Sequence, residues 1–281
     1  GGSAEEAAFD GVEKTFRYMK ATEAKEGKIE LISDVDGLFK VNSDALRAVN
    51  RFGQMMIGTR HGNTEVKAGD KLAGTRIIPL VIEEKKMQDV EKVAMELTGG
   101  GPVLKILPFQ KKKAAVVTTG SEVYKGRIRD TFTPVLLEKL SKYDVEIIGH
   151  KVCDDDHEMV TMTIQHFLEQ GADIVLCTGG MSVDPDDRTP LAIKNTGADI
   201  VTYGAPVLPG AMFMLAYTKE KKAILGLPGC VMYAKRTIFD IVLPRILADD
   251  EIAQEELADL GEGGLCLGCP VCTYPNCGFG K

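Results

Sequence analysis

The sequence predicts an α/β protein: a mostly parallel, three-layer α/β/α domain, preceded by a small β-rich domain and followed by a cysteine-rich tail. Between residues 113 and 248, short apolar runs alternate with helix-like segments, which is typical of a parallel sheet covered on both faces. Before them, short β-type runs lie between turn-rich pieces. The expected segments are an N-terminal helix, the β-rich domain, a connecting helix with linker, the α/β domain and the tail, at 1–26, 27–82, 83–112, 113–248 and 249–281.

Size and charge limit what this chain can be. Its 281 residues suffice for a sizeable core or for two domains. The formal net charge of −7 argues against a general binder of nucleic acid or of anionic membranes. No apolar run approaches the roughly 18 residues that span a bilayer, and no secretory signal is visible. We therefore expect a cytoplasmic location, with neither nucleic acid nor membrane as a partner.

The N-terminal third combines helices with short strands. Apolar residues from Ala8 to Met19 recur at helical spacing, so residues 4–24 are predicted to form an amphipathic helix. The runs KIELI, GLFKV and TRIIPLVI are predicted strands between turn-rich pieces. Residues 43–52 are a predicted short helix, and residues 83–97 are a predicted connecting helix.

The segment after residue 112 alternates regularly. Predicted strands are AAVVTT, VEIIGHKV, DIVLCT, DIVTYG and KKAILGL, with a hairpin region around 207–217. Predicted helices are TPVLLEKLSKY, HEMVTMTIQHFLEQG, DRTPLAIKNTG and VMYAKRTIFDIVLPRIL. Because ligands of such sheets bind outside the carboxyl ends of the strands, the loops at those ends are the candidate site.

Four loops leave those strand ends, at 118–130, 153–156, 179–187 and 227–230. Their glycines let a ligand approach the backbone closely. Backbone N–H groups there, with the hydroxyls of Thr119 and Ser182, can hold phosphate oxygens. The loops therefore predict an anion site.

Carboxylates on the same rim modify that prediction. They are Glu122, Asp130, Asp155 and Asp187. Carboxylates alone repel a phosphate, but carboxylates that hold Mg²⁺ attract it, because this ion bridges carboxylates to substrate phosphates. The competing interpretation is that each Asp is a turn or capping residue, which suits Asp156 and one of Asp186 or Asp187.

Six motifs follow one another in order: TGSE, GRIRDT, a DD loop, GGMSV with DDRTP, a PG step and LPG. Over about 113–247 this series resembles the molybdopterin-binding domain of molybdenum-cofactor biosynthesis proteins. The family includes molybdopterin molybdotransferases, molybdopterin adenylyltransferases and gephyrin, and GGMSV is more similar to the molybdotransferase branch. The cysteine-rich end is similar to that of a bacterial subfamily of these molybdopterin-binding proteins. The resemblance implies molybdopterin, a pterin dithiolene phosphate, or its adenylated form as the ligand.

The resemblance also implies residue roles. Ligand contacts are implied at Thr119, Gly120, Ser121, Glu122, Gly179, Gly180, Ser182, Pro209, Gly210, Leu227, Pro228 and Gly229. Catalytic roles are implied at Asp130, Asp155 and Asp187, the last matching the acid most closely tied to the reaction. After LPG the molybdotransferases usually continue with Asn-Pro, whereas this chain has Cys230 and Val231. The ligand class is therefore better supported than the reaction.

Three functions stay open on this basis. One is molybdopterin binding with Mg²⁺-dependent insertion of molybdate into the adenylated form. The second is a non-enzymatic carrier or sensor of the cofactor, which the departure at Cys230 favours. The third is a nucleotide pyrophosphatase of the competence-protein type. The resemblance further implies a homodimer, with other cofactor-biosynthesis proteins or molybdoenzymes as candidate partners.

The last residues, GLCLGCPVCTYPNCGFGK, hold four cysteines at C-x₂-C-x₂-C-x₄-C spacing: Cys266, Cys269, Cys272 and Cys277. Without a secretory signal, so dense a cluster is typical of metal ligands rather than of disulfides. A tetrahedral zinc site and a [4Fe–4S] cluster are both open. The competing interpretation is a reduced tail with reactive thiols.

Overall fold

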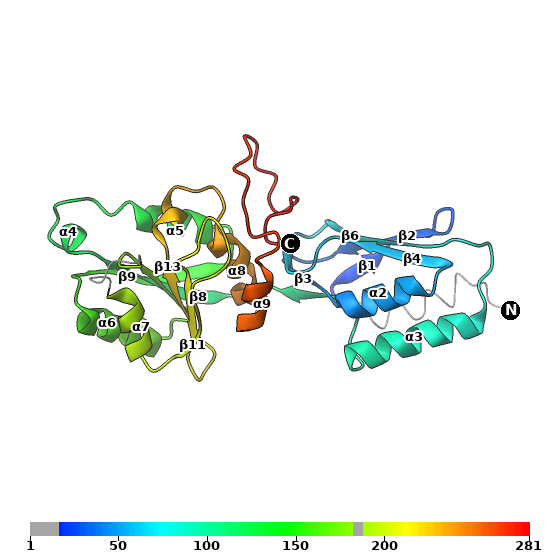
Figure 1. The fold of residues 1–281 in the computed structure, drawn as a ribbon, viewed down its shortest axis with the longest axis horizontal. Coiled ribbons are helices and arrows are strands. Elements are labelled where there is room, and N and C mark those ends of the chain that lie inside the picture. The colour runs from blue at the N-terminus through cyan, green and yellow to red at the C-terminus, as the bar shows by residue number, and fades with distance from the viewer. Residues whose placement is uncertain (1–16, 182–187) are drawn as a thin grey trace. The chain divides into compact units, whose positions relative to one another are not determined.

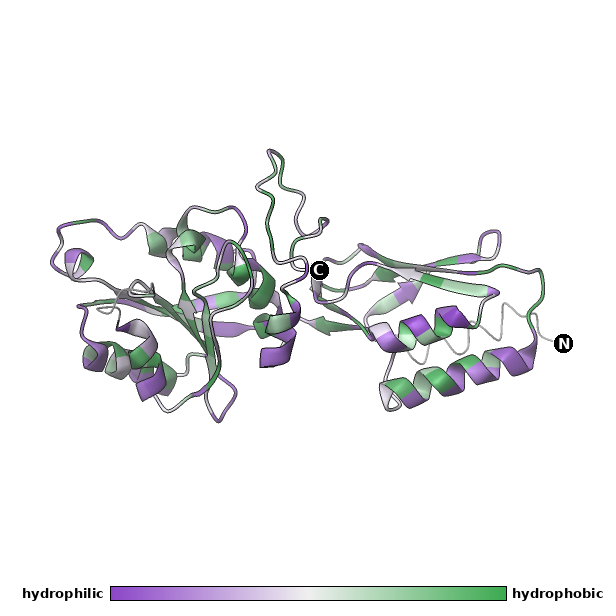
Figure 2. Ribbon diagram, viewed as in Figure 1, coloured by the Kyte–Doolittle hydropathy of each residue, from purple (hydrophilic) through white to green (hydrophobic). Residues whose placement is uncertain are grey.

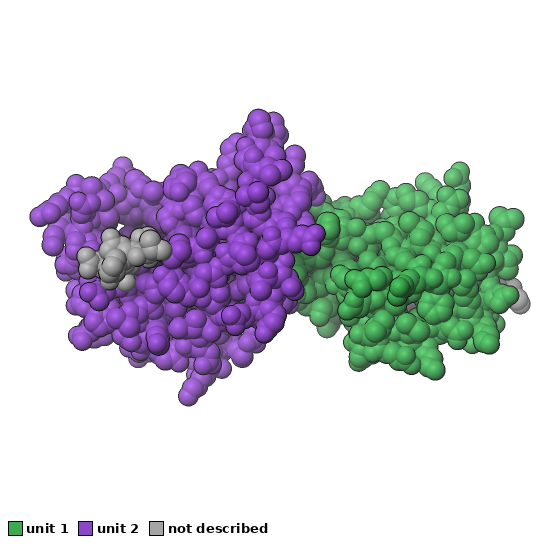
Figure 3. Space-filling view, viewed as in Figure 1, with its two compact units in different colours: residues 1–108 green, residues 109–281 purple. Residues whose placement is uncertain are grey.

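The computed structural model describes residues 17–181 and 188–281. The chain divides into two units, Gly1–Pro108 and Phe109–Lys281 (Figure 3). Each unit has its own clusters of buried apolar side chains, so each is described by itself. None of the helices in the described residues has both the length and the apolar character that crossing a bilayer requires.

The first unit contains two small antiparallel sheets and two helices. One sheet has the order β1-β2-β6-β4, and the other has the order β5-β3-β7. The strands are β1 (Met19–Ala21), β2 (Lys28–Ser33), β3 (Gly37–Val41), β4 (Met55–Thr59), β5 (Thr64–Val66), β6 (Lys71–Ile77) and β7 (Leu104–Pro108). The helices are α2 (Ser43–Arg51) and α3 (Glu84–Thr98), which confirm the predictions for 43–52 and 83–97.

Two predictions for this unit are wrong. Residues 1–16 lie outside the described residues, but the end of the helix predicted for 4–24 is the strand β1, where Met19 pairs with Ser33 and is buried. The predicted linker before residue 112 contains β7, which pairs with β3. Leu104 and Ile106 of β7 alternate with exposed or half-buried residues and enter the core, which is the period of a strand.

The second unit is built on one six-stranded sheet of order β11-β12-β13-β10-β8-β9. Its strands are β8 (Lys112–Thr119), β9 (Val145–Cys153), β10 (Ile174–Thr178), β11 (Asp199–Tyr203), β12 (Met214–Tyr217) and β13 (Ala223–Leu227). The neighbours β9, β8, β10 and β13 are parallel, and only β12 runs against the others. The predicted mostly parallel sheet is confirmed.

Helices cover both faces of this sheet, as predicted (Figure 1). The helices of this unit are α4 (Ser121–Tyr124), which buries no residue, α5 (Phe132–Leu140), α6 (His157–Glu169), α7 (Thr189–Asn195), α8 (Ile238–Leu247) and α9 (Gln254–Asp259). Side chains of β8 alternate between the faces: Val116 packs with α5 and α8, and Val117 packs with α6 and α7. Figure 2 shows the central strands as hydrophobic, which suits strands buried on both sides.

The last long helix begins later than predicted. After β13 the chain forms a short 3₁₀ helix, η1 (Gly229–Met232), and α8 begins only at Ile238. Thr237 is the N-cap: its hydroxyl accepts from the N–H of Phe239 at 3.2 Å, while Asp240 accepts from the N–H of Thr237 at 2.9 Å. This capping box satisfies N–H groups that a helix start leaves open, and it fixes the start of α8.

Candidate functional site

The central strands of the second unit end level with one another. Thr118 lies beside Thr178, and Thr178 lies beside Leu227. From β8 the chain crosses through α5 to β9 on one side, whereas from β10 it crosses through α7 toward β11 on the other. This reversal between β8 and β10 is a topological switch point, where open α/β sheets bind ligands.

Glycines at the switch point bring the backbone of two loops close together. Gly179 has a φ of +81°, and a Cβ there would lie 2.0 Å from the carbonyl oxygen of Thr119. Gly180 has a φ of +56°, and a Cβ there would lie 2.9 Å from the hydroxyl of Thr189. That hydroxyl donates to the carbonyl of Gly179 at 2.8 Å and to the hydroxyl of Thr119 at 3.2 Å. Thr119, Gly179 and Gly180 therefore form one closely packed group with Thr189.

The acids of the second loop bind Ser121 of the first loop. The N–H of Ser121 donates to Asp155 at 2.9 Å, and the hydroxyl of Ser121 donates to Asp154. Asp154 also accepts from the N–H of Asp155, and these bonds, with Ser121 first, lower the pKa of the Asp154 carboxyl. Glu122 is exposed. Asp156 caps α6 by accepting from the N–H of Glu158, as the competing interpretation predicts.

Asp130 lies in a polar network beneath the rim. Its Oδ1 accepts from the N–H groups of Phe132 and Thr133 at 2.8 and 3.1 Å. Its Oδ2 accepts from the hydroxyls of Thr133 at 2.5 Å and Thr118 at 3.3 Å. His150 Nε2 lies 3.3 Å from the same oxygen and 3.0 Å from the Thr118 hydroxyl. Asp130 thus connects the end of β8 to α5 and β9.

This environment decides the ionisation of Asp130. Burial acts to raise the pKa of its carboxyl, but the hydrogen bonds from Thr133 and Phe132 and the nearby His150 outweigh it, so the pKa is lowered. The carboxylate is held charged by groups that already occupy both of its oxygens. As placed, it positions Thr118 and Thr133 and does not present a free oxygen to a metal ion.

The predicted magnesium platform does not assemble in the described residues. Within 17–181 and 188–281, no three His, Cys, Asp or Glu side chains are gathered so that they could share one ion. Ser182, Asp186 and Asp187, which the sequence assigns to the cradle and to the acid of the reaction, lie outside the described residues.

The predicted ligand contacts that come later in the chain lie at the same end of the sheet. Leu227 ends β13 and is buried, and Pro228 and Gly229 lead into η1. Gly210 has a φ of +134°, and a Cβ there would lie 2.5 Å from Ile238. The N–H of Ile238 donates to the carbonyl of Pro209 at 3.2 Å. Pro209 and Gly210 therefore pack against Ile238, the first residue of α8.

Exposed basic side chains lie in two of the rim loops, although the chain is acidic overall. Lys125, Arg127 and Arg129 are exposed on the loop after α4, and Arg188 is exposed just before α7. The positive charge of Lys125 contributes to the lowered pKa of Asp154. The motifs GRIRD and DDRTP contain arginines beside the acids named above, and these arginines are the cations that suit an anionic ligand.

The cysteines divide by burial. Cys153 and Cys177 are buried in the sheet, where burial raises the pKa of both thiols. In the tail, Cys266 and Cys277 are half-buried against the core, whereas Cys269 and Cys272 are exposed. The four tail thiols are not gathered into a group that fits one ion.

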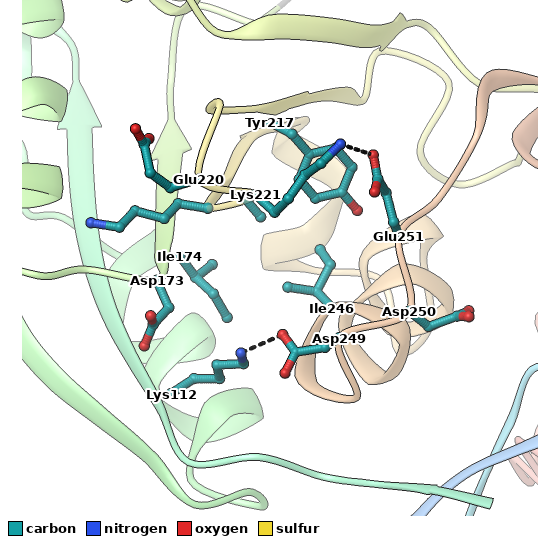
Figure 4. A pocket seen from close by; sticks show the side chains of 12 residues that line it. Lys112, Asp173, Ile174, Tyr217, Glu220, Lys221, Ile246, Asp249, Asp250 and Glu251 are labelled. Atoms are coloured by element: carbon teal, nitrogen blue, oxygen red, sulfur yellow. Dashed lines mark hydrogen bonds and ion pairs between the residues drawn. The ribbon is translucent and has the colours of Figure 1, made fainter.

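A separate hollow of about 360 Å³ lies at the opposite end of the sheet, where β8, β10 and β13 begin (Figure 4). Its cationic side chains are satisfied by the protein itself. Lys112 pairs with Asp249 at 2.5 Å, Lys221 pairs with Glu251 at 2.6 Å, and Lys222 donates to the carbonyl of Leu168 at 2.9 Å. Ligands of parallel sheets bind at the carboxyl ends, so we do not assign the ligand site to this hollow.

Comparison with known families gives a match within the second unit. Residues 115–248 match the family described as "Probable molybdopterin binding domain". The match covers β8 to α8 and all four rim loops. It confirms, for this part of the chain, the family resemblance that the loop motifs predict: the α/β unit contains a molybdopterin-binding type of domain.

Several known proteins are similar to this chain over part of its length. Over 153 residues it is 26% identical to a molybdopterin molybdenumtransferase of Synechococcus elongatus, covering 51% of this chain and 38% of that protein. Over 116 residues it is 31% identical to "Probable FAD synthase" of Caenorhabditis elegans, covering 41% of this chain and 22% of that protein. The tungsten cofactor synthesizing protein MoaB from Pyrococcus furiosus has a TM-score of 0.42 and 21% identity, covering 50% of this chain and 99% of that one.

Proposed function

We propose that the protein binds molybdopterin, free or adenylated, at the switch point between β8 and β10. The ligand is an anion with a terminal phosphate, and adenylation adds a pyrophosphate. The observation that carries the proposal is the level ending of β8, β10 and β13 in glycine-containing turns, fitted together by Gly179 and Thr189. The family match over 115–248 supports the ligand class.

Different groups of residues would have different roles around the phosphate in this proposal. Gly120, Gly179 and Gly180 let ligand oxygens approach the backbone, and the exposed Arg127, Arg129 and Arg188 lie in the same rim motifs. The Thr118–Asp130–His150 network sits below and holds the end of β8 in place. Asp130 is in this proposal a positioning residue rather than a metal ligand.

We propose molybdate insertion into adenylated molybdopterin as the reaction, with release of AMP. The similarity to a molybdopterin molybdenumtransferase supports it, although the chain spans only 38% of that protein. The activity of the whole protein is therefore a proposal distinct from ligand binding. A requirement for magnesium is part of the hypothesis, with Asp187 and Asp155 as the acids to vary.

A titration tests this function directly. Purified protein is titrated with free and with adenylated molybdopterin, with and without Mg²⁺, and AMP is measured after molybdate is added. The transferase hypothesis predicts binding of the adenylated form and Mg²⁺-dependent release of AMP, which Asp187→Ala abolishes without loss of the fold. Full activity in Asp187→Ala contradicts the assigned role. Hydrolysis of an unrelated nucleotide pyrophosphate at a similar rate supports the pyrophosphatase alternative.

The second candidate is a non-enzymatic carrier or sensor of the cofactor. Two observations favour it: Cys230 and Val231 replace the expected Asn-Pro, and four cysteines lie at metal-ligand spacing in the tail. Because the structure does not gather these thiols, binding of zinc or of an iron–sulfur cluster requires the tail to regroup. Anaerobic purification with metal analysis tests it. One zinc, or four irons and four sulfides, per chain supports the candidate if Cys269→Ser lowers that content.

The assembly state belongs to the same proposal. A homodimer is expected from the family resemblance, and so are contacts with other cofactor-biosynthesis proteins or with molybdoenzymes. Sedimentation of the purified chain, alone and with ligand, measures the first of these. A chain that stays monomeric with and without ligand contradicts the expected homodimer.

A further inference from the structure

The C-terminal tail is bound to one of the late rim segments by backbone hydrogen bonds. The N–H of Leu208 donates to the carbonyl of Gly264 at 2.8 Å, and the N–H of Cys266 donates to the carbonyl of Leu208 at 2.8 Å. Leu208 directly precedes Pro209 and Gly210, the PG step of the rim. The start of the tail therefore holds this step in register.

The middle of the tail is bound to the other late rim segment. Tyr274 donates its hydroxyl to the carbonyl of Asp240 at 2.9 Å. The guanidinium carbon of Arg236 lies 4.7 Å from the centre of the Tyr274 ring. Lys235 donates to the carbonyl of Pro270 at 3.3 Å. Both basic residues lie between η1 and α8, in the segment 228–237 that follows Leu227.

The tail is closed at its base and anchored in the core. The N–H of Gly280 donates to the carbonyl of Gly263 at 3.0 Å, which joins its two ends. Phe279 is buried in the same apolar cluster as Ile238 and Ile241 of α8. Figure 1 shows the tail as the red loop that follows α9. A closed loop with a buried anchor can hold the segments it touches.

Arg236 is the residue where these contacts meet. It stacks on the tail through Tyr274 and forms an ion pair at 3.0 Å with Asp240, a carboxylate that is only 6% exposed. Lys139 of α5 binds the same carboxylate at 2.8 Å. Arg236 thus links the tail to the first turn of α8 and, through Asp240, to α5.

We propose that the tail is a clamp on the two late rim segments, 207–210 and 228–237, and that Arg236 and Tyr274 are the positioning residues through which it sets affinity for the pterin ligand. The proposal rests on the proposed function for its ligand, but not for the clamp itself. A ligand that needs both segments in place is bound more weakly when either contact is lost. If the tail were only a surface loop, its loss would alter stability and leave the rim unchanged.

Two variants test the clamp, with a matched control. Tyr274→Phe removes one hydroxyl and keeps the ring, and Arg236→Gln removes the charge. Lys221→Gln removes a charge at the opposite end of the sheet, where Lys221 pairs with Glu251 on the surface. Each full-length variant is compared with the parent by amide hydrogen exchange of peptides covering 207–210 and 228–237, without ligand, and by titration with molybdopterin. Thermal unfolding confirms that each variant is folded.

The clamp predicts faster exchange in these two segments in Tyr274→Phe and Arg236→Gln, with the loop 153–156 unchanged. It also predicts that the dissociation constant for molybdopterin rises about fivefold or more in Arg236→Gln and less in Tyr274→Phe, in the range of ordinary coupling between sites. Lys221→Gln changes neither quantity. Unchanged exchange in both variants, or an equal rise in all rim loops, overturns the clamp. If the parent protein binds no pterin but the variants still speed exchange at 207–210 and 228–237, the proposed function fails and the clamp stands.

Discussion

Asp130 illustrates how one residue's role changes when its neighbours are known. In the sequence it is an acid on a predicted metal-binding rim. In the structure both of its oxygens accept hydrogen bonds, from Thr133, Phe132 and Thr118. A charged acceptor with several donors is a strong organiser of local structure. Asp130 therefore organises the loop between β8 and α5.

Asp130→Asn should destabilise the protein at pH 7 by roughly 1–3 kcal/mol, because it weakens a charge-assisted network. The lowered pKa of Asp130 gives the sign of the pH dependence. Its contribution is complete above the ordinary value of 3.8 and is lost as the pH falls through the lower folded-state value. The stability difference between the parent and Asp130→Asn should therefore shrink below pH 4 in urea unfolding.

Asp199→Asn, on the exposed start of β11, is the control for this experiment, because it removes a carboxylate outside the network. It should leave the pH profile close to that of the parent. A difference between parent and Asp130→Asn that grows on acidification contradicts a carboxylate held charged by the fold.

Gly179 tests the close fit of the rim. Gly179→Ala should cost more stability than Gly197→Ala, although the two glycines have φ values of +81° and +80°. Both substitutions place a side chain in a strained backbone conformation, which costs of order 1–3 kcal/mol. Only at Gly179 does the new Cβ also meet a backbone atom, at 2.0 Å, whereas nothing lies within 4 Å at Gly197. Equal costs in denaturant unfolding would show that the loops do not touch as described.

The sequence could identify the glycines and acids of the rim because motif order places them at strand ends. It could not identify Thr118, Thr133 and His150 as one network, because their contacts join residues far apart in the chain. Arg127 and Arg188 could have been identified as well, since they stand inside the quoted motifs GRIRDT and DDRTP.

The start of α8 is an element defined by its cap. Thr237→Ala should cost about 1 kcal/mol of folding free energy, because it removes the hydroxyl that accepts from the N–H of Phe239. Thr237→Ser keeps that hydroxyl and should cost less, apart from the loss of a buried methyl group. Thermal unfolding of both variants measures the difference. A serine variant as unstable as the alanine variant assigns the cost to packing rather than to capping.

Helices and strands with a regular spacing of apolar residues could be predicted from the sequence. The strands of the α/β unit and helices α6 and α7 confirm the predictions, because apolar runs bounded by glycine or a capping aspartate leave little choice. Three boundaries were wrong for local reasons. The helical spacing of apolar residues continues through Met19, although Met19 belongs to β1. The two buried residues of β7 lie between glycines and lysines, so the sequence shows no clear strand pattern there. The helix after β13 is predicted to begin before its cap at Thr237.

The two units carry separate cores, and this has a measurable consequence for the whole molecule. Clusters around Phe39 and Val49 stabilise the first unit, and clusters around Val116 and Val117 stabilise the second. We expect denaturant unfolding, followed by hydrogen exchange, to show two transitions. Ligand at about 100 times its dissociation constant should stabilise only residues 109–281, by roughly 2.7 kcal/mol. A single transition, raised as a whole by ligand, contradicts this independence.

The central claim is that the switch point of the α/β unit binds a phosphorylated pterin. The most direct measurement is calorimetric titration of the full chain with molybdopterin, free and adenylated, beside the variant Gly179→Ala. The account predicts saturable binding of at least one form, lost or strongly weakened in Gly179→Ala and retained in Gly197→Ala. Absence of binding to both forms by the folded parent protein, or equal binding by Gly179→Ala, contradicts it.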